Sequence, residues 1–267
     1  MQIQAENYNL FANLVDQAKN IIVLADKNQT ADLLYAALFF ESHLATFGKN
    51  VQIVAGAKLP EDFRQFETKV KYKIEPKKLV VSLNWRKNAV DKVSYNLDGE
   101  YFNFVVTPRN ANIKPEDIKV FQKGSDVDLI VALGVDSLSS LTATERDYIR
   151  DKDVVNIDIK SQNQLFGRLN IVNEAADSVC GVIADLIEKT GMQSPPSSID
   201  FLLRGIREAT ENFSRVNDPT TFEAAAFCTK VKKGQTLGRK FEIRQEKFDA
   251  PAEWLTPKVF RSKNPTS

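Results

Sequence analysis

The sequence contains a single histidine, two cysteines and no long apolar run. Each of these features limits the kinds of site or mechanism that the protein can have. Because His43 is the only imidazole, any mechanism that needs two or more imidazoles is excluded. His43 lies between Phe40 and Phe47 in an apolar-striped segment, not in a loop at a strand end, which favours a structural or surface role. Cys180 and Cys228 lie far apart in predicted helices, so we interpret them as small buried side chains and not as a disulfide or a metal-binding pair.

Nothing in the sequence directs the chain to a membrane or gives it a strong net charge. The N-terminus has no basic segment followed by an apolar one, and no apolar run approaches the length of a membrane span. The formal net charge is +1, so no global field favours nucleic acid or an acidic membrane surface. We therefore predict a cytoplasmic protein that does not contact a membrane.

Residues 21–57 carry the pattern around which the rest of the chain is arranged. An apolar run at 21–25 is followed by polar residues, by a helix-period stripe up to Gly48, and by a second apolar run at 51–55. Thr30 is placed to cap the helix, and Gly48 stands where a left-handed C-cap belongs. These features predict a β-α-β unit, in which the loop after the first strand faces the ligand crevice.

The same alternation of strands and helices continues further along the chain. Apolar runs at 129–133 and 154–158 predict two more buried strands of the same sheet. Helices are predicted near residues 7–20, 58–66, 142–150, 174–190, 198–213 and 219–231. We therefore predict an α/β fold with a mainly parallel sheet and helices on both faces, formed by residues 1–232.

Two segments depart from this α/β pattern. Residues 78–108 contain two alternating runs around Asp98-Gly99, which predicts an antiparallel β-hairpin insertion, with 79–83 as a third strand beside it. Residues 233–267 form a Pro-punctuated tail without regular periodicity. Its large apolar side chains, Trp254, Leu255 and Phe260, suggest a peptide that docks on this body or on a protein partner, with a disordered linker as the alternative.

The loop after the first strand resembles the first motif of the DHH phosphoesterase superfamily, which includes RecJ-type exonucleases, nanoRNases and pAp phosphatases. That motif runs roughly His-x-Asn-Pro-Asp-Gly-Asp at the end of a strand. Asn28 and Asp32 match it, whereas Asp26 stands at the position of the metal-binding His and Thr30 at that of the middle Asp.

The motif that names the superfamily, Ile-Asp-His-His followed by Asn and Phe-Gly, is similar to residues 157–167. Asp158 and Asn163 match, but the two histidines are replaced by Ile159 and Lys160. In the second and fourth motifs the acidic positions are occupied by Gly134 and Ala209, with Asp136 two residues beyond the former. The resemblance covers about residues 20–230, and we expect no counterpart of the superfamily's second domain in residues 233–267.

The resemblance implies a scaffold that in its relatives holds two cations, usually Mn²⁺, with carboxylates and imidazoles that activate water. Of those ligands only Asp32 and Asp158 remain, with Asp26 as a carboxylate in place of a His. Lys160 would place an ammonium where the cations sit, which repels metal but suits a carboxylate or phosphate. A paired metal site is therefore not expected.

We predict a catalytically degenerate, non-enzymatic binding module without a cofactor, which binds a nucleotide-like or other anionic ligand, or a protein partner. The alternative is a divalent-metal-dependent phosphodiesterase, with Mn or Mg in a remodelled carboxylate-only site. The sequence leaves the oligomeric state open. The candidate ligand-binding residues of the cleft are Asp26, Lys27, Asn28, Asp32, Asp136, Asp158, Lys160 and Asn163.

Overall fold

The chain divides into two units, which are described separately. The computed structural model describes all residues except 1–4, 75–77, 85–89, 110–112, 124–126 and 235–267. The larger unit takes its residues from Met1–Glu75 and Asp126–Ile243, and the smaller unit includes Pro76–Ser125. The predicted tail residues Trp254, Leu255 and Phe260 lie outside the described residues.

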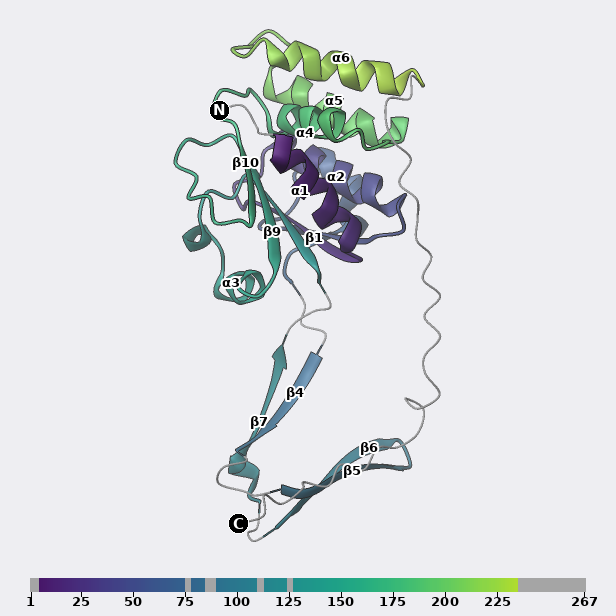
Figure 1. Cartoon of the computed structure of the whole chain (residues 1–267), viewed down its shortest axis with the longest axis vertical. Helices are drawn as coiled ribbons and strands as arrows, with labels where there is room; N and C mark the ends of the chain where they lie inside the picture. The colour runs from purple at the N-terminus through teal and green to yellow at the C-terminus, as the bar shows by residue number, and fades with distance from the viewer. Residues whose placement is uncertain (1–4, 75–77, 85–89, 110–112, 124–126, 235–267) are drawn as a thin grey trace. The chain divides into compact units, whose positions relative to one another are not determined.

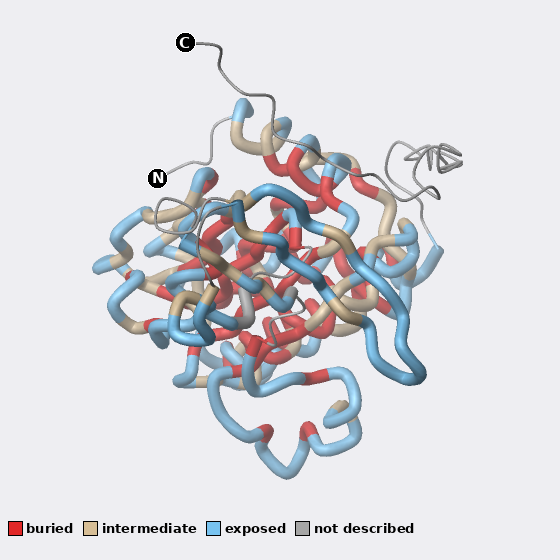
Figure 2. The backbone as a smooth tube through the Cα atoms, turned by 90° about the horizontal axis from the view of Figure 1, so that it is seen from below, coloured by how far each residue is buried: buried red, intermediate tan, exposed pale blue. Residues whose placement is uncertain are grey.

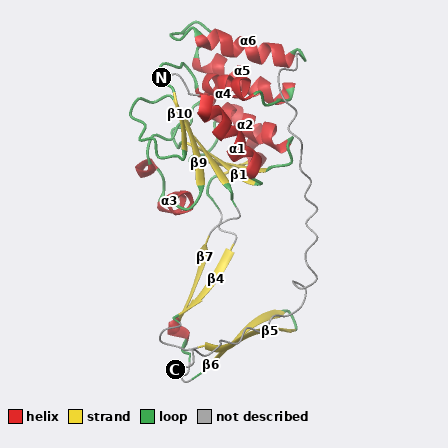
Figure 3. Ribbon diagram, viewed as in Figure 1, coloured by secondary structure: helices red, strands yellow, loops and turns green. Residues whose placement is uncertain are grey.

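A six-stranded parallel sheet in the order β10-β9-β8-β1-β2-β3 forms the centre of the larger unit (Figures 1 and 3). The four strands predicted for the parallel sheet, β1, β2, β8 and β9, all belong to it, which confirms the predicted fold class. Two further strands at its edges were not predicted, because runs of two and four residues carry too little periodicity. The strands are β1 (Asn20–Ala25), β2 (Asn50–Ala55), β3 (Val70–Lys71), β8 (Leu129–Leu133), β9 (Asp153–Asp158) and β10 (Leu169–Val172).

Helices cover both faces of the sheet, as predicted (Figure 1). Alternate strand residues such as Val23 and Val131 belong to the main core, which they share with α1, α2 and α4, while α5 and α6 pack on α2 and α4. The intervening strand residues share a smaller core with α3. Figure 2 shows the buried residues concentrated inside this unit. The helices are α1 (Ala5–Gln17), α2 (Ala31–Ala45), α3 (Ala143–Ile149), α4 (Val179–Thr190), α5 (Pro196–Ala209) and α6 (Thr220–Lys232), with 3-10 turns η1 (Glu61–Lys69), η2 (Pro115–Asp117) and η3 (Leu138–Ser140).

Side-chain caps fix the start of the two helices that border the strand ends. Thr30 Oγ1 accepts the N–H of Leu33 at 3.3 Å and so begins α2, as the sequence predicted. Gly48, which follows α2, has φ of +70°, the conformation predicted for it. Helix α4 begins at residue 179, later than predicted, because the Ser178 hydroxyl caps it by accepting the N–H of Gly181 at 2.9 Å.

The smaller unit contains two antiparallel strand pairs (Figure 3). Strands β5 (Val90–Asp98) and β6 (Tyr101–Pro108) form the predicted hairpin around Gly99, whose φ is +59°. Strand β4 (Lys78–Leu83) does not lie beside this hairpin as expected. It pairs instead with β7 (Ile118–Lys123), a strand the sequence analysis did not identify. Among the described residues, no helix is long and apolar enough to cross a membrane.

Candidate functional site

The carboxyl ends of β1, β8 and β9 meet at one edge of the sheet and position most of the predicted site residues. The ladder continues one residue past β1 and β8, since Asp26 N donates to Leu133 O at 3.0 Å and Gly134 N donates to Ile157 O at 2.9 Å. Asp26, Gly134 and the end of β9 are therefore held side by side by backbone hydrogen bonds. This edge is where ligands of open α/β sheets bind.

Lys160 joins the loops at this edge of the sheet, where the sequence predicts a ligand cleft (the strand-end cleft). Its Nζ atom donates to Asp26 Oδ2 at 3.2 Å and to the carbonyl oxygen of Gly134 at 2.5 Å. The Asp26 side chain is only 4% exposed, against 33% for Lys160. The other oxygen of Asp26 accepts the N–H of Asn28 at 2.7 Å. The carboxylate that stands in place of the superfamily's histidine is thus neutralised by a lysine of the same chain.

Gly134 is suited to its role by its backbone conformation and its neighbour. Its φ of +68° lies in the region that favours glycine, and a Cβ atom there would come within 2.8 Å of Leu33 Cδ1. The acidic residue of the second DHH motif would therefore meet α2 at this position. In this chain the position contributes a carbonyl acceptor for Lys160 instead of a carboxylate.

Asp158 and Asn163 form a second hydrogen-bond network, in which Asp158 is buried and Asn163 is partly buried. Asp158 is 0% exposed, and its Oδ1 accepts the N–H groups of Ile159 and Lys160 at 2.8 and 3.3 Å. Asn163 Nδ2 donates to Asp158 Oδ2 at 2.8 Å and to Val135 O at 3.0 Å. This amide therefore holds the loop after β9 against the loop after β8, and both carboxylate oxygens of Asp158 have protein donors.

Asp32 faces away from these residues and binds the start of α4. Its Oδ2 accepts the N–H of Val179 at 2.7 Å, and its Oδ1 accepts the N–H of Cys180 at 3.0 Å. Burial raises the pKa of Asp32, and hydrogen bonds from Cys180 and Val179 oppose that shift. A negative charge at a helix N-terminus is favourable, so this carboxylate acts as a cap between two helices.

The remaining predicted residues lie in the loops after β1 and β8. Lys27 and Asn28 are exposed, and Asp136 is partly exposed. The loop that contains Lys27 and Asn28 packs closely against the loop after β2. Gln29 Nε2 donates to Ala57 O at 2.8 Å, and a Cβ atom on Gly56 would lie 2.7 Å from Lys27 Cα. The structure thus brings together Asp26, Asp158, Lys160 and Asn163, with Asn28 through its amide. Among the described residues, no group of three or more His, Cys, Asp and Glu side chains is arranged to hold a metal ion.

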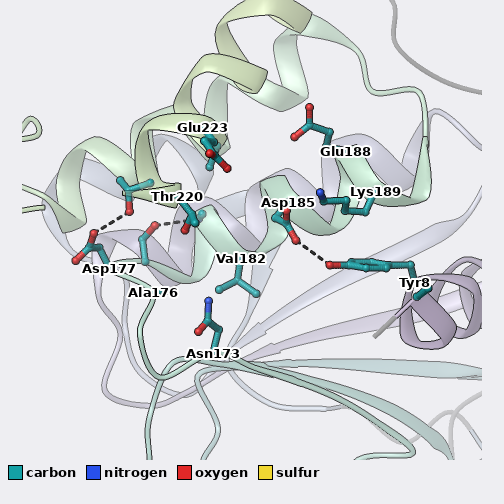
Figure 4. A pocket seen from close by; sticks show the side chains of 15 residues that line it. Tyr8, Asn173, Ala176, Asp177, Val182, Asp185, Glu188, Lys189, Thr220 and Glu223 are labelled. Carbon is teal, nitrogen blue, oxygen red and sulfur yellow. Dashed lines mark hydrogen bonds between the residues drawn. The ribbon is translucent and has the colours of Figure 1, made fainter. Parts of the chain in front are cut away.

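A separate cavity of about 480 Å³ lies between α1, α4 and the start of α6, and contains none of the eight predicted residues. Figure 4 shows Tyr8 of α1 pointing at Asp185 of α4, to which its hydroxyl donates at 3.0 Å. Burial, together with the charge and hydrogen bond of Asp185, raises the pKa of Tyr8 to about 12. Glu188 and Glu223 also line this cavity. The sequence analysis missed it, because its residues come from three distant segments without a shared motif.

The observed architecture is that of an α/β protein with a six-stranded parallel sheet. No protein-family model matches the chain. Its structure is similar to the crystal structure of an exopolyphosphatase-related protein from Bacteroides fragilis, with a TM-score of 0.59 and 12% sequence identity. The similarity covers 86% of this chain and 58% of that protein, so the chain spans little more than half of its length. At this identity the likeness shows a shared fold alone.

Proposed function

We propose that the protein is a non-hydrolytic binding module on a phosphoesterase-like α/β fold. The observation that carries this proposal is the contact of Lys160 Nζ with Asp26 Oδ2 and Gly134 O in the strand-end cleft. A two-metal phosphodiesterase needs that space for cations and needs several free carboxylates around it. Here an ammonium group fills the space, and Asp158 and Asp32 are engaged by protein donors.

The chemistry that remains in this cleft is recognition, not water activation. A metal-bound hydroxide requires ligands whose lone pairs face a cation, and each removed ligand weakens the field that lowers the pKa of the bound water. The Lys160–Asp26 pair supplies rigidity to the loops after β1 and β8. We therefore propose that this edge of the sheet holds a binding surface in a fixed conformation.

The experiment is a combined binding and turnover assay on the full chain. We expect no Mn²⁺ binding by calorimetry at micromolar affinity, and no hydrolysis of a short oligonucleotide, a nucleotide phosphate or inorganic polyphosphate with Mn²⁺ or Mg²⁺. Metal-dependent turnover that is lost in Asp158→Ala but kept in Asp147→Ala would contradict the proposal. Asp147 is the matched control because it is an exposed carboxylate on α3, outside the cleft.

A small anion is a second candidate ligand for the same cleft. Lys27 is exposed and directly follows Asp26, the partner of Lys160, in the loop before α2, whose first N–H groups favour negative charge. Pyrophosphate or a nucleoside monophosphate should then raise the melting temperature of the wild type. The shift should fall in Lys27→Ala and persist in Lys58→Ala, a nearby exposed lysine. Equal shifts in both variants would assign the effect to general ionic strength.

A further inference from the structure

The β5–β6 hairpin presents one face made entirely of apolar side chains. The register places Val93 opposite Val106, Tyr95 opposite Phe104, and Leu97 opposite Phe102. Because alternate residues of a strand point to the same side, these three pairs share one face. We call this surface the hairpin face; it consists of Val93, Tyr95, Leu97, Phe102, Phe104 and Val106.

The reverse side of the same hairpin is mostly polar. It carries Lys92, Ser94, Asn96, Asn103 and Thr107 together with Asp98, Tyr101 and Val105. Asn103 Nδ2 donates to Asn96 Oδ1 at 3.0 Å on this side. The hairpin is therefore amphipathic, with a polar side suited to solvent and an apolar side suited to packing against protein.

None of the hairpin-face residues is buried within the part of the chain that the structure describes. Their side chains are between 36% and 75% exposed. The rings contact one another, with centroids 5.3 Å apart for Tyr95–Phe102 and 4.9 Å apart for Phe102–Phe104, but these contacts lie within the face and do not cover it. A two-stranded hairpin alone is marginally stable in water, so this one requires a cover on its apolar side.

The exposed area matches what a dimer interface needs. Aromatic side chains have about 150–250 Å² each, so the exposed fractions of the hairpin face correspond to roughly 600 Å² per copy. Two such faces in contact would remove roughly 1,200 Å² from water, which is the lower end of the range for specific protein interfaces. The aromatic content and the lack of charge are also typical of an interface core.

No charged residue belongs to the hairpin face. Lys92 and Asp98 belong to the reverse side, and Arg109 pairs with Asp91 at the open end. A face without charged residues meets its own copy without repulsion, as a two-fold interface requires.

We propose that the hairpin face is covered by the hairpin face of a second copy of this chain. The two hairpins stack face to face about a two-fold axis, with the Tyr95–Phe104 pair at the centre. The proposal does not depend on what the strand-end cleft binds, because it rests on the smaller unit alone.

Sedimentation equilibrium of the full chain tests the association. We expect a mass twice the 30.0 kDa of one chain over about 1–100 μM. Leu97→Asp/Phe104→Asp should weaken the dimer at least tenfold, because it places charges in the contact. Asn96→Asp/Thr107→Asp, with the same charges on the reverse side, should remain dimeric. A monomeric wild type over this range, or equal weakening by both double variants, would overturn the proposal.

Thiol cross-linking provides a readout that does not depend on disrupting the hairpin. Facing sheets lie about 10 Å apart, so a short bifunctional maleimide spans two copies of Tyr95→Cys. Cys180 and Cys228 are buried and leave the new thiol as the reactive one. We expect efficient cross-linking of Tyr95→Cys and little of Asn96→Cys on the reverse side. Equal yields from the two variants would contradict the face-to-face arrangement.

The tail of the same chain is the competing occupant, and a truncation after residue 234 distinguishes it. If the tail covers the hairpin face, the full chain is monomeric and the truncated chain self-associates, which overturns the proposal. If the second copy covers it, both forms are dimers and Leu97→Asp/Phe104→Asp dissociates both. Unchanged melting temperatures for the larger unit would confirm that the variants remain folded.

Discussion

Asp32 and Cys180 are joined by two hydrogen bonds that connect α2 to the first turn of α4. Cys180 N donates to Asp32 Oδ1 at 3.0 Å, and Cys180 Sγ donates to Asp32 O at 3.3 Å. Because the carboxylate also accepts the N–H of Val179, a residue that matches a metal ligand in the DHH motif serves here to orient two helices.

Asp32→Asn should destabilise the protein although the side chains are nearly the same size. The amide can accept one of the two N–H groups and must direct its own NH₂ at the other. Leaving a buried donor unsatisfied costs about 1–3 kcal/mol, so we expect a loss of that size in the free energy of urea unfolding. Asp136→Asn is the matched control and should change it by less than about 0.5 kcal/mol. Equal effects of the two substitutions would place Asp32 in the cleft after all.

The close approach of α5 to the same pair gives a second prediction. A Cβ on Gly205 would lie 2.2 Å from Cys180 Sγ and 3.1 Å from Asp32 Oδ1. Gly205→Ala should therefore lower the free energy of unfolding by about 1–3 kcal/mol through overpacking. Cys180→Ala removes the sulfur, so the double variant should be less destabilised than the sum of the two single variants, by at least about 0.5 kcal/mol. Additive effects in this double-mutant cycle would mean that the overlap is relieved elsewhere.

The sequence predicted the fold well where periodicity and caps agree. The apolar runs of β1, β2, β8 and β9, and the Thr30 cap, belong to local patterns of several residues, and the structure confirms them. Short or long-range features were missed. Strand β7 pairs with β4 across the hairpin between them, and no local pattern specifies that partner.

The positions of the candidate residues at the strand ends were predictable, but their hydrogen-bond network was not. The motif frame placed Asp26, Asp158, Lys160 and Asn163 at strand ends, because loops after parallel strands meet at one edge. It did not indicate that Asp32 would face α4, since the direction of a helical side chain depends on which neighbour packs there. The hydrogen bond from Lys160 to the Gly134 carbonyl could not be predicted either, because every residue has a backbone carbonyl and the residue type does not show which one accepts.

His43 is buried between aromatic rings, which makes stability depend on pH. Its ring stacks on Phe39 at 5.0 Å and meets Phe47 edge-on, also at 5.0 Å. Burial lowers the pKa of His43 from 6.5 to about 3. Between these values the unfolded chain binds the proton and the folded chain does not. This residue therefore makes the free energy of unfolding fall as pH decreases from about 6.5 toward 3, by up to about 1.4 kcal/mol per unit.

His43→Phe should remove this dependence. Since the sequence has one histidine, a difference between wild type and variant that grows from about pH 7.5 to about pH 5 is assigned to this residue. We expect the variant to be relatively more stable at the lower pH by about 1–3 kcal/mol, measured by urea unfolding. A constant difference across this range would show that the folded protein accommodates the protonated ring.

The Lys160–Asp26 pair should behave as a coupled unit. Lys160→Met leaves Asp26, which is 4% exposed, without its counter-charge, and an uncompensated buried carboxylate is costly. We expect a loss of about 1–3 kcal/mol at neutral pH. Asp26→Asn/Lys160→Met should recover most of it, because the neutral amide can still accept the N–H of Asn28 through its oxygen. Lys27→Met, an exposed lysine of the same loop, should change the free energy of unfolding by less than about 0.5 kcal/mol. If Lys160→Met is as mild as Lys27→Met, the ion pair is not what holds the strand-end loops together.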